Sequence, residues 1–128
     1  MKIVVVIARI VLGLMFVFFG LNGFLNFLPA PPLQGVAGTF IGALISSHYV
    51  YLVCAIQLIA GVLLLANQFV PLALALLAPV IANIITYHLT MQSSNAQLAI
   101  LATVLWMILA WRFRAYFAPL FVRKTVLN

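Results

Sequence analysis

The stretch IVVVIARIVLGLMFVFFGLNGFLNFL, residues 3–28, decides the fold of this chain, because Arg9 is its only charged residue. A helix rises about 1.5 Å per residue, so roughly 20 apolar residues cross the hydrocarbon core of a bilayer. The stretch therefore predicts a membrane-spanning helix over about residues 3–28. Pro29, Pro31 and Pro32 follow it. They end the helix, since proline lacks the backbone N–H and clashes with the preceding turn.

The composition of the whole chain is that of a membrane protein. Hydrophobic residues make up 68% of it and charged residues 5%, whereas charged residues are about a quarter of a soluble domain. There is no Asp and no Glu, which excludes most mechanisms of general acid–base catalysis by carboxylates. We therefore predict no catalytic residue and no metal site. The cations form no basic stripe, so no nucleic-acid partner is expected.

Three more apolar segments extend the pattern, at about residues 49–66, 70–90 and 96–111. Residues 34–47 are too short to span. They place Val36, Phe40 and Leu44 on one helical stripe opposite a small, weakly polar face, which is typical of an interfacial or re-entrant helix. The sequence thus predicts an all-α fold, an integral membrane four-helix bundle with a short helix between its first two spans. It forms a single transmembrane domain over residues 1–128, with a basic tail at 112–128.

The charges orient the predicted spans. All six cations lie near the two ends of the chain, at Lys2, Arg9, Arg112, Arg114, Arg123 and Lys124. An even number of spans puts both ends on one side, and cytoplasmic loops are rich in Lys and Arg. The prediction is a multi-pass protein of the bacterial inner membrane with both termini cytoplasmic. The cations act as anchors there, Arg9 by snorkelling to the interface, and they can meet anionic lipid headgroups.

Glycines share a helical face with Arg9 in the first span, at Gly13, Gly20 and Gly23. Small residues let two membrane helices approach closely. We expect this face to pack against another helix, within the chain or in a partner.

Polar side chains gather in the outer half or midplane of the predicted spans, at Asn22, Gln57, Asn83, Tyr87 and His88. Polar groups facing hydrocarbon lose hydrogen bonds, so they are expected to turn inward and meet. Asn83 and Tyr87 are one turn apart and share a face, whereas His88 is rotated by about 100° from Tyr87. We therefore expect the side chains of Asn83 and Tyr87, more than that of His88, to point into the pocket. A quinone headgroup could bind there, or His48 and His88 could ligate a haem iron. Alternatively, each group bonds only to a neighbouring helix or lies at the interface.

Ala8-Arg9-Ile10-Val11-Leu12-Gly13, with Gly20 and Asn22-Gly23-Phe24, resembles the opening of the DoxX family. The run from Asn67 to His88, with Pro71, Pro79, Asn83 and Tyr87, is similar to a stand-alone branch of that family, and the resemblance extends over Ile3 to Tyr116. It implies a four-helix membrane bundle linked to membrane redox assemblies; the family is named after a subunit of an archaeal thiosulfate:quinone oxidoreductase. Many members carry an acidic residue in the second span where this chain has Gln57, which cannot ionise.

The function predicted from these features is that of a non-catalytic accessory or scaffold subunit of a larger membrane complex, which the resemblance implies to be a redox complex. Its partners are the lipid bilayer and other membrane subunits. The alternative is a quinone- or haem-binding oxidoreductase subunit that uses the outer polar pocket. A small transporter is disfavoured, because proton coupling usually relies on a membrane carboxylate.

Overall fold

The computed structural model describes residues 2–25, 34–91 and 96–126. In these residues it is all-α, as the sequence predicts. The helices are α1 (Lys2–Leu25), α2 (Gly35–Ser46), α3 (Val50–Ala66), α4 (Val70–Thr90) and α5 (Gln97–Arg112), followed by the short 3-10 helices η1 (Arg114–Tyr116) and η2 (Ala118–Phe121). The predicted boundaries agree to within about two residues where both ends are described. The predicted end of the first span, and the prolines after it, lie outside the described residues.

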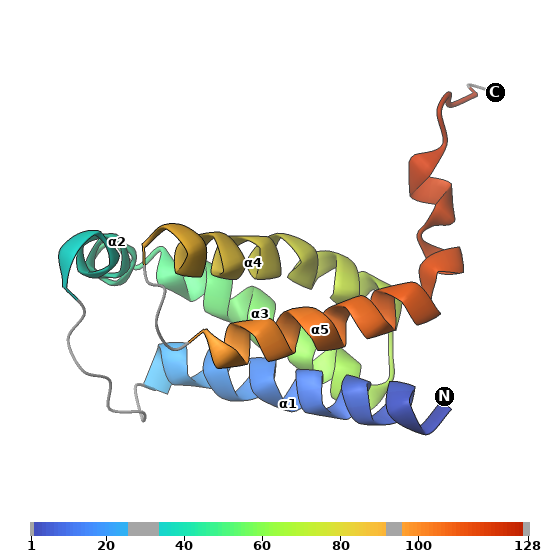
Figure 1. The fold of residues 1–128 in the computed structure, drawn as a ribbon, viewed down its shortest axis with the longest axis horizontal. Coiled ribbons are helices and arrows are strands. Elements are labelled where there is room, and N and C mark those ends of the chain that lie inside the picture. The colour runs from blue at the N-terminus through green and yellow to red at the C-terminus, as the bar shows by residue number, and fades with distance from the viewer. Residues whose placement is uncertain (1, 26–33, 92–95, 127–128) are drawn as a thin grey trace.

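Four of the helices lie side by side, with α2 beyond one end of the group (Figure 1). α1 contacts α3 and α5, and α4 contacts the same two helices, so the four form a closed ring of neighbours. Successive members of the ring run in opposite directions (Figure 1). We call the end that carries Lys2 and Arg112 the arginine end, and the opposite end the α2 end. The largest fully buried side chains come from all four helices and are Leu12, Leu64, Leu74, Leu77 and Leu109.

The contact between α1 and α3 is made backbone to backbone at glycines. A Cβ atom on Gly20 would lie 2.9 Å from the Leu58 nitrogen and 3.0 Å from the Cys54 oxygen. On Gly61 of α3 it would lie 2.8 Å from the Val17 nitrogen. Any larger residue must therefore push the two helices apart.

The glycine face of α1 lies along α3 over most of its length. A Cβ atom on Gly13 would lie 3.1 Å from the Gly61 oxygen, and one on Gly23 would overlap the Cys54 sulfur at 2.0 Å. α3 is thus the helix that meets this face, and Gly61 of α3 is the glycine opposite it.

Arg9 ties α1 to the last turn of α3. Its Nη1 donates hydrogen bonds to the backbone oxygens of Leu64 and Leu65, the second at 3.3 Å. Since α3 ends at Ala66, these carbonyls belong to the last turn, where helices lack intrahelical donors and favour a cation. Arg9 therefore has hydrogen-bond acceptors within the protein. The prediction that it acts as an interfacial anchor did not include them.

The opposite pair of helices is joined by an indole. Trp106 of α5 donates from Nε1 to the backbone oxygen of Leu74 in α4 at 2.9 Å. This hydrogen bond adds to the van der Waals packing that holds the two apolar helices together.

Length and hydropathy show which helices can cross a membrane. Within the described residues, α1 with 24 residues and α4 with 21 are long and apolar enough. α2 and α3 pass only as a pair, which is bent by 84°. α5 has 16 residues and is shorter, about 24 Å at the usual rise, against a hydrocarbon core of about 30 Å. Two helices, or three with the bent pair, thus meet the requirement, and the four-span arrangement stays a prediction.

Candidate functional site

A cavity of about 270 Å³ lies between the helices of the ring. Its lining comes from all four of them: Met15, Phe16, Phe19, Gln57, Ile84, His88, Leu98, Ala99 and Ala102. These residues are late in α1 and α4 and early in α5, which places the cavity towards the α2 end. We call it the Gln57 cavity.

Two of the predicted site residues come together here. Gln57 and His88 both line the Gln57 cavity, both are half-buried, and the rest of the lining is apolar. The His88 ring packs against the Tyr87 ring, edge to face, with centroids 5.2 Å apart. An imidazole and a carboxamide each offer a donor and an acceptor, so one polar group of an otherwise apolar molecule could be held between them.

The expectation that Asn83 leads an inward polar cluster is wrong. Asn83 is exposed on α4, and its side-chain nitrogen donates to the Pro79 oxygen at 2.8 Å. This bond to the preceding turn uses one of the two N–H donors of the carboxamide within its own helix, and the side chain lies along α4 on its exposed side. The order predicted for Asn83 and His88 is therefore reversed.

Tyr87 and Asn22 are not part of the cavity lining. Tyr87 is half-buried and its ring lies 5.9 Å from that of Phe40, so it links α4 to α2. Asn22 is half-buried near the end of α1. The five predicted residues thus divide among four surroundings.

The two histidines also have different surroundings. His48 lies in the turn between α2 and α3, is exposed, and stacks on Tyr51 with centroids 5.6 Å apart. His88 lines the Gln57 cavity, and His48 does not. Across residues 2–25, 34–91 and 96–126, no cluster of three or more His, Cys, Asp or Glu side chains could hold a metal ion.

The Gln57 cavity combines an apolar lining with two polar side chains, Gln57 and His88. Each of them can donate and accept a hydrogen bond. The amide of Gln57 stays neutral. The lining therefore suits a guest with a polar group and an apolar body.

A family model described as DoxX matches residues 4–90 of the chain. The match runs from α1 to the end of α4, while α5 lies beyond it. No curated protein and no solved structure matches the chain. The family match and the apolar helices together show that the protein is embedded in a membrane. Because the match covers more than half of the sequence, the chain belongs to the DoxX family.

Proposed function

We propose that this protein is a non-catalytic accessory or scaffold subunit of a larger membrane complex, and that α4 carries its partner-facing surface. The observation that supports this most directly is a small and polar stripe on the exposed side of α4. Small or polar exposed residues recur there at helical spacing, at Ala75, Pro79, Ala82, Asn83, Thr86 and Thr90. The exposed leucines Leu72 and Leu89 lie on the same side, near the two ends of the helix. Small and polar residues favour contact between membrane helices over contact with lipid.

The polar members of the stripe are held in place by their own helix. Thr86 donates to the Ala82 oxygen at 2.8 Å, and Thr90 to the Thr86 oxygen at 2.7 Å. The exposed side of α1 is different, because Ile7, Leu14 and Phe18 project bulky apolar groups there. This contrast favours a protein partner at α4 and lipid at α1. The family's association with redox assemblies makes a redox complex the first candidate for the larger assembly.

The proposed topology has four spans, α1, α3, α4 and α5, with α2 at the interface. The cations of α1 and α5 lie at the same end of the ring (Figure 1), and positive residues favour the cytoplasmic side. We expect reporter fusions at Asn128 and within residues 92–95 to be found on opposite sides of the bacterial inner membrane. Fusions on the same side would contradict the four spans.

Site-specific crosslinking tests the accessory role. A photo-crosslinking amino acid in place of Thr86, in cells that express the chain at its native level, is expected to give an adduct with a different membrane polypeptide. The matched control is Leu101, which is exposed near the same end on α5. It is expected to give no protein adduct, because lipid surrounds an apolar exposed side chain.

Two results would contradict the proposal. If Thr86 and Leu101 crosslink equally, α4 has no special surface. If the Thr86 adduct is a dimer of this chain alone, the protein is a homo-oligomer, and the accessory role is wrong. Identification of the adduct by mass spectrometry separates these cases.

The alternative function, a quinone- or haem-binding oxidoreductase subunit, rests on Gln57 and His88 in one apolar cavity. Of the two ligands, quinone is the better supported, because a carbonyl oxygen needs one donor whereas haem needs an axial ligand and a much larger space. Quinone that co-purifies with the wild-type protein but is lost in Gln57→Leu would favour this function; its presence in both proteins would not.

A further inference from the structure

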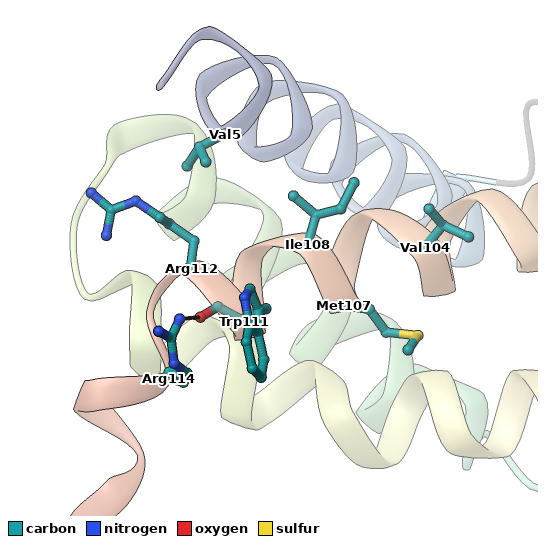
Figure 2. A pocket seen from close by; sticks show the side chains of 7 residues that line it. All are labelled: Val5, Val104, Met107, Ile108, Trp111, Arg112 and Arg114. Carbon is teal, nitrogen blue, oxygen red and sulfur yellow. Dashed lines mark hydrogen bonds between the residues drawn. The ribbon is translucent and has the colours of Figure 1, made fainter. Parts of the chain in front are cut away.

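We propose that a groove between α1 and α5 at the arginine end binds an anionic phospholipid. The groove has a volume of about 500 Å³. Its walls are apolar, and two guanidinium groups lie at one end (Figure 2). The residues that line it are Val5, Val104, Met107, Ile108, Trp111, Arg112 and Arg114. We call it the α1–α5 groove.

The apolar part of the groove has the place and length for an acyl chain. It extends from Arg112 back to Val104, a distance of about 12 Å along α5 at the usual helical rise. Met107 is 59% exposed and Trp111 67% exposed, so these side chains face the surroundings of the helix ring. Trp is enriched at the level of lipid headgroups, where its ring can meet both acyl chain and headgroup.

The two arginines of the groove each contact an aromatic ring. Arg114 donates to the Trp111 oxygen at 2.8 Å, and its guanidinium carbon lies 4.3 Å from the Trp111 ring centroid. Arg112 lies 5.7 Å from the Phe113 ring centroid. Since a guanidinium has five N–H donors, both arginines keep donors for a bidentate contact with phosphate.

Charge complementarity decides the kind of occupant. The sequence contains no Asp and no Glu, so no side chain of this protein can neutralise the two arginines. A soluble anion would pair with the arginines and leave the apolar walls uncovered. A neutral lipid would cover the apolar walls and leave the charge of the arginines without a counterion. An anionic phospholipid such as phosphatidylglycerol fills both parts. The groove is formed by α1 and α5, so this proposal can fail or hold independently of the partner surface proposed on α4.

Trp111 is a probe within the groove itself. The chain has two tryptophans, and the fluorescence of Trp106 is obtained from Trp111→Phe and subtracted. In nanodiscs of phosphatidylcholine, bromine-labelled phosphatidylglycerol is expected to quench Trp111 with about 25-fold higher apparent affinity than bromine-labelled phosphatidylcholine. Each arginine near an anionic lipid contributes about fivefold to that preference.

The double variant Arg112→Gln/Arg114→Gln is expected to lower the preference to about equal quenching by the two lipids. The matched control, Arg123→Gln/Lys124→Gln, removes the same charge from the exposed tail and is expected to keep most of the preference. Thermal unfolding checks that both doubles are folded. An equal loss in both would mean a general attraction to the surface and would overturn the site.

Two further results would also overturn it. Relief of quenching by soluble glycerol phosphate would mean that the arginines bind an anion without its acyl chains. Absence of quenching by either lipid in the wild-type protein would mean that another protein or a second copy covers the groove. Retained quenching with glycerol phosphate present supports a bound lipid.

Discussion

Gly20→Leu is expected to lower the free energy of unfolding by about 3 kcal/mol or more, the upper part of the usual range for overpacking. The reason is geometric. The first added carbon would already lie 2.9 Å from the Leu58 nitrogen and 3.0 Å from the Cys54 oxygen. Both atoms belong to the backbone of α3, which cannot turn aside as a side chain can, so α1 and α3 must separate.

The measurement is unfolding of the purified protein in mild detergent, by heat and by titration with a denaturing detergent. Gly42→Leu is the matched control, because a Cβ atom on Gly42 of α2 would meet nothing within 4 Å. That variant is expected to unfold like the wild type or slightly later, since leucine favours helix over glycine. Equal stability of Gly20→Leu and Gly42→Leu would show that α1 and α3 are not in contact at this depth.

Arg9→Met is expected to cost about 2 kcal/mol of stability, within the range for hydrogen bonds to a charged donor. Methionine keeps the length and apolar stem of the side chain but cannot donate to the Leu64 and Leu65 oxygens. The Leu64 oxygen keeps the Asn67 N–H as a donor, so the expected loss is that of the charge-assisted hydrogen bonds from Arg9.

Two variants separate the hydrogen bonds from the charge. Arg123→Met removes one positive charge from an exposed position and is expected to leave the unfolding transition unchanged. Arg9→Lys keeps the charge but loses the planar donor fork, so an intermediate loss is expected. If Arg9→Lys is as stable as Arg123→Met, the positive charge alone, and not the donor geometry of arginine, stabilises this position.

Much of the fold could be predicted from the sequence because apolar length and helix breakers are local properties. The helix predicted over residues 34–47 forms at Gly35–Ser46, and the segment predicted at 70–90 forms at Val70–Thr90. The close-packing face of α1 could also be predicted, since Gly13 and Gly20 repeat at helical spacing. The helix that packs against this face could not be predicted, because a single glycine such as Gly61 does not indicate which helix it will meet.

The polar site was predicted less well, for a physical reason. Depth along a helix follows from residue number, but the rotation of the helix about its axis depends on packing with its neighbours. Asn83 lies on the exposed side of α4 and not towards the other helices, and its side chain donates to the Pro79 oxygen in the turn before it. The hydrogen bonds from Arg9 to α3 were not predicted either. Every helix ends in free carbonyls, and the sequence does not show which helix end lies beside Arg9.

The contact between Arg9 and α3 has a consequence for the time course of synthesis. Arg9 and the Leu64 carbonyl are 55 residues apart, and ribosomes add about 5–20 residues per second, so the partner is made about 3 to 11 seconds later. Until α3 is made, the Arg9 guanidinium lacks the two carbonyl acceptors of Leu64 and Leu65. The arrival of α3 then completes this contact before α4 and α5 have been made, so α1 and α3 can pair first and the other two helices can pack against them.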